Sequence, residues 1–518
     1  MRLRLLASAA IVLAVASSAT AQPRGTARQA QPVGARPLGY AETQTLAALQ
    51  RIRQLDPRIG SVIAIDPTAL AQAARVDMGG LRGPLAGQPV LIKDNIEMAG
   101  PLPTTAGSLA LAGNVTGRDA PLVTRLRAAG TVIVGKANLS EWANFRSTGS
   151  ISGWSAIGGQ TRNPHALDRN PCGSSSGSAT AVAAGLVRLA VGTETDGSIT
   201  CPAAINGIVG FKPTVGMISR THVIPISESQ DTPGPMTPTV REAALLLTAM
   251  AGSDPADSAT READTRKRDF AAGLNRDALK GKRIGVMRFA SGFGTEEAFE
   301  RALAVLKAQG ATLVEIKEFD DSAIGGNEFK ALLAEFKTGL NNYLKSSPAQ
   351  LPARDLKGLI AFNKANAARE MPLFGQELFE QAEATRGTAD PAYRRARQLS
   401  FNAAGPNGID RLLRANRLDA LVGPTMPPAW KIDAVNGDQI GGGGAGSLAA
   451  VAGYPHLTVP MGQVKGLPVG LSFMGAKWSD AAILGLGYAY EQARGPIPNA
   501  RFLRSIEESP AIAPALKR

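Results

Sequence analysis

A lysine and a glycine-rich run in this sequence have the residue types needed for attack on a carbonyl group. The run 192–198, GTETDGS, follows an apolar, strand-like segment and ends in Ser198. Its glycines allow a sharp turn, so successive backbone N–H groups can point at one place and stabilise an oxyanion. Lys93 directly follows the apolar residues 90–92, where a partly desolvated amine loses its proton more readily and can act as a base. Together these features favour catalysis by a serine nucleophile.

The run 173–177, GSSSG, offers a competing nucleophile. It satisfies the Gly-x-Ser-x-Gly pattern of the α/β-hydrolase nucleophile elbow, with Ser175 at its centre. That elbow needs an apolar strand directly before it, whereas residues 163–171 are polar and interrupted by prolines. It also needs an acid and a histidine later in the chain, and His222 or His456 is available as the histidine. An esterase that uses Ser175 is therefore an alternative that the preceding polar segment disfavours.

Neither a nucleotide nor a metal cofactor is predicted. Gly130, Gly135 and Lys136 have the spacing of a phosphate-binding loop, but Ala137 stands where a Ser or Thr would hold Mg²⁺. The four residues between the two glycines, TVIV, are typical of a strand and not of an open loop. The chain has two cysteines, no Cys-x-x-Cys pair and only three histidines, which argues against a metal site built on these ligands.

The composition is that of a globular protein. Of the 518 residues, 44% are hydrophobic and 19% are charged, which excludes disorder for the bulk of the chain. The formal net charge is +13, from 56 Lys and Arg against 43 Asp and Glu. These charges form no run of five like residues and no basic stripe with aromatics, so we expect scattered surface charge and no nucleic-acid partner.

Residues 1–21 have the three regions of a Sec-type export signal. Two arginines precede the apolar run 5–16, and small residues around Ala21 fit the cleavage rule. The apolar run is too short to cross a bilayer, and no cysteine follows it, so we expect no stable membrane anchor. Cleavage before Gln22 would give a secreted or periplasmic protein.

Strand-like and helix-like segments alternate through most of the remaining chain. We expect a flexible tail over 22–40, a catalytic domain over 41–510 and a C-terminal tail over 511–518. Helical patterns occur at 41–55, 120–129, 178–184 and 296–309, and strand patterns at 90–92, 131–134, 185–192, 283–287, 420–422, 457–459 and 469–473. This alternation predicts an α/β fold, a large mixed sheet covered by helices on both faces, and the charged stretch 251–282 is interpreted as a surface connection.

Several runs, in a fixed order, resemble the amidase signature family. The runs are 93–95 (KDN), 173–177 (GSSSG), 192–198 (GTETDGS), 202–207 (PAAING), 210–214 (GFKPT), 453–455 (GYP), 458–460 (TVP) and 466–471 (GLPVGL). The resemblance covers nearly everything from about residue 41 onward. Within the family, 138–146 and 174–207 look most like bacterial peptide amidase.

The resemblance implies a catalytic triad without histidine. In it Ser198 is the nucleophile, Ser174 is a bridging serine that follows a cis peptide bond, and Lys93 is the base. The interval of 24 residues between the two serines matches the family and selects Ser174 over its neighbours. If Lys93 must be neutral, the adjacent Asp94 cannot be its partner, and strand alternation points that side chain the other way.

The resemblance further implies an oxyanion hole built from backbone N–H groups and no cofactor. The residues concerned are Thr195, Asp196, Gly197 and Ser198. Asp196 stands where the family often has glycine, so its side chain either meets substrate or caps the following helix.

The implied function is a secreted amidohydrolase that cleaves linear carboxamides, with C-terminal peptide amides favoured, to an acid and ammonia. Its partner would be a small-molecule or peptide amide. The alternatives are a glutaminase-type component of glutamyl-tRNA amidotransferase and a non-catalytic amide-binding protein. The sequence leaves open the oligomeric state, a bond between Cys172 and Cys201, a groove role for Trp154 and a lip role for 441–444.

Overall fold

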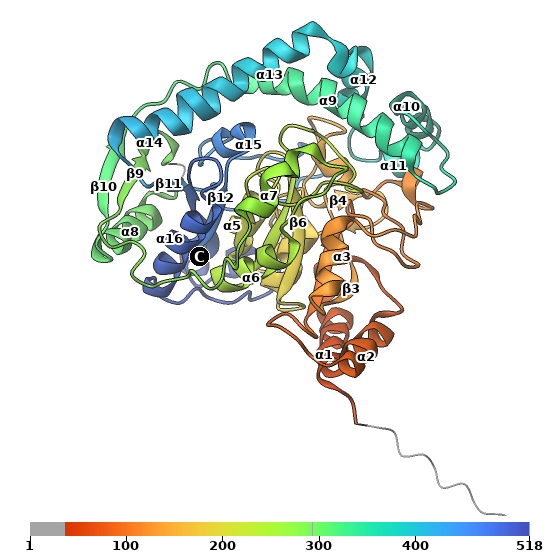
Figure 1. Cartoon of the computed structure of the whole chain (residues 1–518), viewed down its shortest axis with the longest axis horizontal. Coiled ribbons are helices and arrows are strands. Elements are labelled where there is room, and N and C mark those ends of the chain that lie inside the picture. The colour runs from red at the N-terminus through yellow and green to blue at the C-terminus, as the bar shows by residue number, and fades with distance from the viewer. Residues whose placement is uncertain (1–36, 293, 517–518) are drawn as a thin grey trace, which may run out of the picture. The chain divides into compact units, whose positions relative to one another are not determined.

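A computed structural model describes residues 37–292 and 294–516, of which Gly39 onward belongs to one compact unit (Figure 1). The expected export signal and tail lie outside the described residues, apart from the last four positions of the tail. The fold begins with a helix at Tyr40, one residue before the predicted start.

The unit is built on a mixed sheet of eleven strands. Their order across the sheet is β1-β3-β2-β6-β8-β7-β12-β13-β11-β9-β10. The strands are β1 (Val62–Ile65), β2 (Pro89–Lys93), β3 (Val132–Ala137), β6 (Leu189–Glu194), β7 (Val209–Lys212), β8 (Thr232–Thr237), β9 (Arg283–Met287), β10 (Thr312–Ile316), β11 (Ala420–Pro424), β12 (His456–Val464) and β13 (Leu467–Met474). Strand β2 runs parallel to β3 and β6, and β9 runs parallel to β10 and β11, while the remaining pairs are antiparallel. The short strands β4 (Trp154–Ser155) and β5 (Gly159–Gln160) form a separate hairpin.

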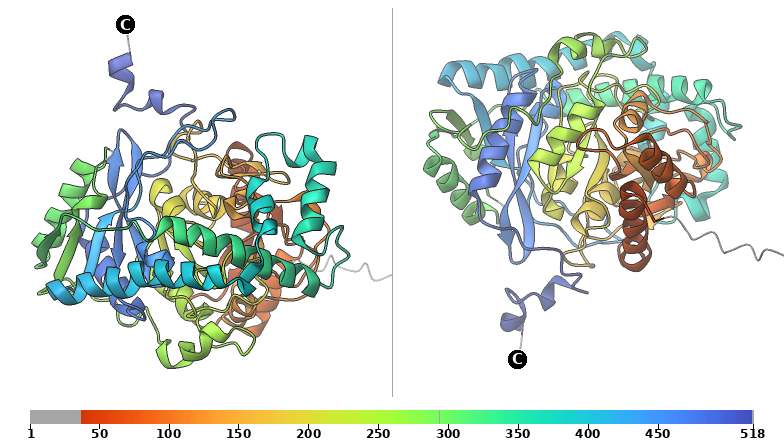
Figure 2. Two further views of the ribbon diagram at one scale, coloured as in Figure 1. Left: turned by 90° about the horizontal axis from the view of Figure 1, so that it is seen from above. Right: turned by 60° about the horizontal axis from the view of Figure 1, so that its bottom comes forward.

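Helices cover both faces of this sheet. The α-helices of the described residues are α1 (Tyr40–Leu55), α2 (Ala69–Gly79), α3 (Pro121–Ala128), α4 (Ser176–Ala183), α5 (Thr200–Asn206), α6 (Val240–Met250), α7 (Ala263–Arg266), α8 (Glu296–Ala308), α9 (Gly325–Ser346), α10 (Leu356–Ala365), α11 (Ala367–Glu370), α12 (Glu377–Ala384), α13 (Pro391–Ala404), α14 (Asp410–Asn416), α15 (Leu448–Ala452), α16 (Asp480–Ala493) and α17 (Ala513–Leu516). The long helices α9 and α13 pack along each other and form an outer layer (Figures 1 and 2).

The central strand β2 shows why the apolar runs of the sequence become strands. Val90 and Ile92 point into a core shared with α3, α6, α8 and α16. Leu91 points to the opposite face, into a core shared with α1, α2 and α4. Because both faces are buried, every position of such a strand is apolar, and polar side chains occur only at the end of the strand.

The predicted α/β fold is confirmed, while several element boundaries differ from the prediction. The strand expected at 185–192 begins only at Leu189, because Gly185 adopts φ +72° just past the end of α4. Glycine takes this left-handed conformation without a steric penalty and so closes the helix. The stretch 251–282 contains α7 and lies within the same compact unit, as expected for a surface connection. In the described part of the chain, no helix is long and apolar enough to cross a membrane.

Candidate active site

Lys93, at the end of β2, places its amine in the protein interior. The residue has no exposed surface, and its Nζ lies 2.7 Å from Ser174 Oγ. The same nitrogen also donates to Thr193, at 2.9 Å to the hydroxyl and 3.2 Å to the carbonyl. Asp94 points to the other side of the strand, where it lies 3.4 Å from Lys136, so the prediction that it does not pair with Lys93 is confirmed.

Burial lowers the pKa of Lys93 from its ordinary value to about 7. Removing the charged ammonium form from water costs more than removing the neutral amine, and this desolvation is the dominant cause. The carboxylates of Asp231 and Glu194 oppose the shift, since they attract the protonated form. These two nearby anions were not predicted from the sequence. At neutral pH a large share of this amine is therefore free to accept a proton.

Ser174, which is hydrogen-bonded to this amine, belongs to a segment that lies beside the run carrying Ser198. The peptide bond between Gly173 and Ser174 is cis, as the resemblance implied. The N–H of the next residue, Ser175, donates to the carbonyl of Ser198 at 3.1 Å, so the two serine segments are bonded directly to each other. Ser174 is fully buried, whereas Ser198 is 8% exposed and lines a cavity. This arrangement brings Lys93, Ser174 and Ser198 together from three distant parts of the chain.

Ser175 is placed differently from the nucleophile of an elbow. Its Oγ donates to the carbonyl of Thr193 at 3.0 Å and accepts from the N–H of the same residue at 3.2 Å. The ring of His456, one of the two histidines open to that hypothesis, is hydrogen-bonded to Ser472 at 2.6 Å. Burial lowers the pKa of His456 to about 3. Ser175 thus joins the serine segment to β6. His456 remains neutral and is hydrogen-bonded to Ser472 instead of Ser175.

The segment Thr195 to Ser198 forms one wall of the cavity. Gly197 has φ +79°, a left-handed conformation that turns the backbone directly before Ser198. The hydroxyl of Thr195 donates to Asp231 at 2.5 Å and fixes the start of the segment. All four residues expected to form the oxyanion hole therefore border the same space as the serine.

Asp196 faces the cavity, and Glu194 caps the next helix. A carboxylate oxygen of Glu194 accepts from the N–H groups of Ile199 and Thr200 at 2.8 and 2.9 Å, where α5 begins. The interpretation of Asp196 as a helix cap is therefore wrong, because the neighbouring acid fills that place. The Asp196 side chain lines the cavity, where desolvation by the surrounding protein raises its pKa to about 6.

The cavity has a volume of about 520 Å³ and two kinds of wall. The polar wall carries the serine segments. The large apolar side chains of the lining are those of Phe145, Ile226, Leu332, Leu378, Met426 and Ile440. Ile440, Gly446 and Ser447 flank the glycine run 441–444, which places that run at the cavity rim. Trp154 instead packs edge-on against Phe374, with ring centroids 5.2 Å apart, in agreement with a packing role.

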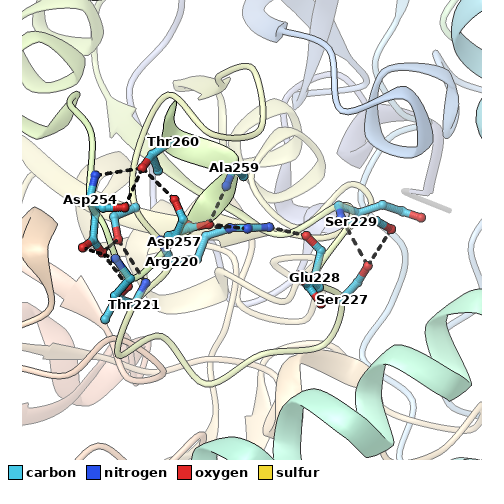
Figure 3. A network of polar contacts seen from close by, with 12 residues as sticks. Arg220, Thr221, Ser227, Glu228, Ser229, Asp254, Asp257, Ala259 and Thr260 are labelled. Carbon is cyan, nitrogen blue, oxygen red and sulfur yellow. Dashed lines mark hydrogen bonds and ion pairs between the residues drawn. The ribbon is translucent and has the colours of Figure 1, made fainter. Parts of the chain in front are cut away.

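A polar network holds the loop from Arg220 to Ser229, which ends two residues before Asp231 in the chain (Figure 3). Arg220 donates to both carboxylate oxygens of Asp257, at 2.6 and 2.8 Å, and also to the carbonyl of Glu228. Beyond it, Glu335 of α9 accepts from the backbone and side chain of Ser229 at 3.0 and 3.1 Å. The loop is thereby anchored between the surface connection and α9. In the sequence, Asp231 stands out only as a single acidic residue directly before β8, and that signal was too weak to predict its role.

Two features bear on cofactors and on the cysteines. In the ranges 37–292 and 294–516, no cluster of three or more His, Cys, Asp or Glu side chains could hold a metal ion. Cys172 and Cys201, whose pairing the sequence left open, form a disulfide with their Cα atoms 6.1 Å apart.

Comparisons with known proteins point in one direction. The family profile named Amidase matches residues 43–484. A probable amidase of Arabidopsis thaliana is 41% identical over 464 residues, which cover 86% of this chain and 85% of the plant protein. A putative amidase of Arthroderma benhamiae is 38% identical over 502 residues, with coverage of 89% and 81%.

Among solved structures, the native peptide amidase of Stenotrophomonas maltophilia is similar throughout. It superposes with a TM-score of 0.85 and 52% sequence identity. The match covers 89% of this chain and 95% of that one.

Proposed function

Because this chain belongs to the amidase family and is an amidohydrolase of carbon–nitrogen bonds, we propose that it removes the carboxamide from the C-terminus of peptides. The products would be a peptide acid and ammonia. One observation carries the proposed chemistry: the buried amine of Lys93, with a pKa of about 7, lies 2.7 Å from Ser174 Oγ beside the cavity that contains Ser198.

The proposed reaction passes one proton along three side chains. Neutral Lys93 accepts the proton of Ser174 while Ser174 accepts that of Ser198, whose Oγ attacks the amide carbon. The carbonyl oxygen becomes an oxyanion against the N–H groups of the Thr195 to Ser198 segment. The relay then returns the proton to the amide nitrogen, which leaves as ammonia. Water hydrolyses the acyl-enzyme by the same relay and releases the acid.

The charges around the cavity favour a peptide amide over free glutamine. The lining residues of the described chain include the acids Asp196 and Asp438 and no lysine or arginine. Free glutamine would bring an α-carboxylate into this acidic space, where no lysine or arginine of the lining can pair with it, and burying a charge without such a partner is costly. A C-terminal peptide amide has no such carboxylate near the scissile group. The apolar wall, which includes Phe145 and Leu378, can accept its side chain.

A substrate panel tests this preference. With ammonia release as the readout, we expect kcat/KM for an N-acetylated dipeptide amide to exceed that for glutamine by about 100-fold or more, which corresponds to ~2.7 kcal/mol. A fatty acid amide and an aryl amide complete the panel as controls for chain length and leaving group. Equal or faster turnover of glutamine would instead favour an amidotransferase-type glutaminase.

We also propose that the mature protein acts after export. The signal-like residues 1–21 motivate this, and the Cys172–Cys201 disulfide supports it, because such bonds persist in oxidising compartments. Expressed at full length in a Gram-negative host, the protein should reach the periplasm with Gln22 as its first residue. A chain that begins at Gln22 should stay in the cytoplasm and serves as the control. Activity in each fraction and N-terminal sequencing of the active protein decide, and active protein confined to the cytoplasm with residues 1–21 still attached would refute export.

A further inference from the structure

We propose that the disulfide between Cys172 and Cys201 positions Ser174 and Ser198 for the proton relay, so that the rate of the reaction depends on its oxidised state. The proposal rests on the function proposed above. In this view the two cysteines are positioning residues for the two serines.

The disulfide joins the two serine segments, and each cysteine lies within three residues of its serine in the chain. Cys172 stands two residues before Ser174, in the loop that leads into α4. Cys201 stands three residues after Ser198, as the second residue of α5. Both cysteines line the cavity, so the bond lies beside the reacting groups and not on a remote surface.

Hydrogen bonds tie each cysteine to a residue close to its serine in the chain. The N–H of Cys201 donates to the carbonyl of Gly197 at 2.8 Å, which ties α5 to the residue before the proposed nucleophile. On the other side, the carbonyl of Cys172 accepts from Ser176 Oγ at 2.6 Å. A shift of either sulfur would therefore be passed to a serine, because little free chain lies between them.

The backbone at Cys172 gives a second, independent reason. Its φ of +56° lies in the left-handed region, which residues other than glycine rarely adopt. The N–H of this residue is held by the side chain of Asn170 at 2.8 Å. Once the sulfur bond is cut, the loop can relax toward a conformation that cysteine prefers, and Ser174 would move with it. Displacements of about 1 Å near a reacting group can cost ~100-fold in rate.

Reduction is a balanced two-electron step. A phosphine such as TCEP breaks the sulfur–sulfur bond and delivers two electrons, while two protons from water leave Cys172 and Cys201 as thiols. The phosphine leaves as its oxide. Both residues border the cavity, with Cys172 5% and Cys201 4% exposed, which gives a small reductant a route to the bond.

The test compares the oxidised and the TCEP-reduced protein. Thiol alkylation followed by mass spectrometry verifies that reduction is complete, and circular dichroism verifies that the fold persists at the assay temperature. We expect kcat for a peptide amide to fall at least 10-fold with KM changed less than threefold, and to recover on reoxidation. The rate at which a fluorophosphonate labels Ser198 should fall in parallel.

Two variant pairs separate positioning from a general loss of stability. Cys172→Ala with Cys201→Ala should be as slow as the reduced protein and should not respond to TCEP. Cys172→Gly with Cys201→Ala removes the same bond but permits the left-handed backbone, so it should regain part of the lost rate.

The outcomes are distinguishable from a failure of the proposed function. Unchanged kcat and labelling after complete reduction, with only a lower melting temperature, would overturn the positioning role. Absence of any labelling of Ser198 in the oxidised protein would overturn the proposed function itself.

Discussion

Replacing Ser198 by alanine should lower kcat for amide hydrolysis by about 10⁴-fold or more and abolish covalent labelling by a fluorophosphonate. The reason is chemical, because the variant retains the cavity and the backbone donors but lacks the oxygen that attacks the amide carbon. Intact mass after labelling, together with ammonia release, measures both effects. A circular dichroism spectrum equal to that of the parent protein verifies the fold.

Ser175→Ala is the matched control for this variant. Ser175 is also a buried serine, but its hydroxyl is held by the backbone of Thr193 on both its donor and acceptor sides. Its loss should lower stability by about 1–3 kcal/mol and leave measurable activity and full labelling. The reverse pattern, with Ser175→Ala inactive and Ser198→Ala active, would make Ser175 the nucleophile.

Replacing Lys93 by arginine should leave the enzyme nearly inactive. Arginine stays protonated at every useful pH, so it cannot accept the proton of Ser174. Lys93→Met, which keeps an unbranched side chain of similar length without the amine, should lose at least the ~10²–10⁴-fold typical of general-base removal. Steady-state kinetics on a peptide amide measure both variants.

The Lys93 variants also separate chemistry from packing. Loss of rate in the methionine variant with a melting temperature near that of the parent assigns the effect to the base. Near-normal turnover by Lys93→Arg would show that the residue acts only as a positive charge or a structural support.

The strands of the sheet could be predicted because their side chains are buried on both faces of the sheet. Residues 90–92 and 420–422 are apolar throughout, since each strand is buried on both faces. The same regularity predicted that Lys93 and Asp94 point apart, and Asp94 indeed pairs with Lys136. The local sequence pattern was therefore enough to predict these strands, because burial alone decides which residue types occur in them.

The assembly of the site required more than local pattern. Lys93 and Ser198 are 105 residues apart in the chain, and the order of the strands in the sheet brings them close together. The motifs alone did not predict this proximity, which was implied only by their resemblance to a family. The effect of Asp231 on the pKa of Lys93 was not predicted because it acts through space from a loop. Similarly, the spacing of Cys172 and Cys201 does not specify a Cα separation, which the tertiary fold sets at 6.1 Å.

The pH dependence of kcat/KM for a peptide amide, measured between pH 5 and 9, tests most directly whether neutral Lys93 drives the reaction. The pKa of this amine is about 7, so protonation below that pH removes the base and the rate should fall along an acid limb centred near pH 7. Asp196, whose pKa is about 6, also titrates in this range, and Asp196→Asn should therefore keep the limb near pH 7. A rate that stays constant from pH 8 down to pH 5, in the parent protein and in Asp196→Asn, would contradict the proposed relay.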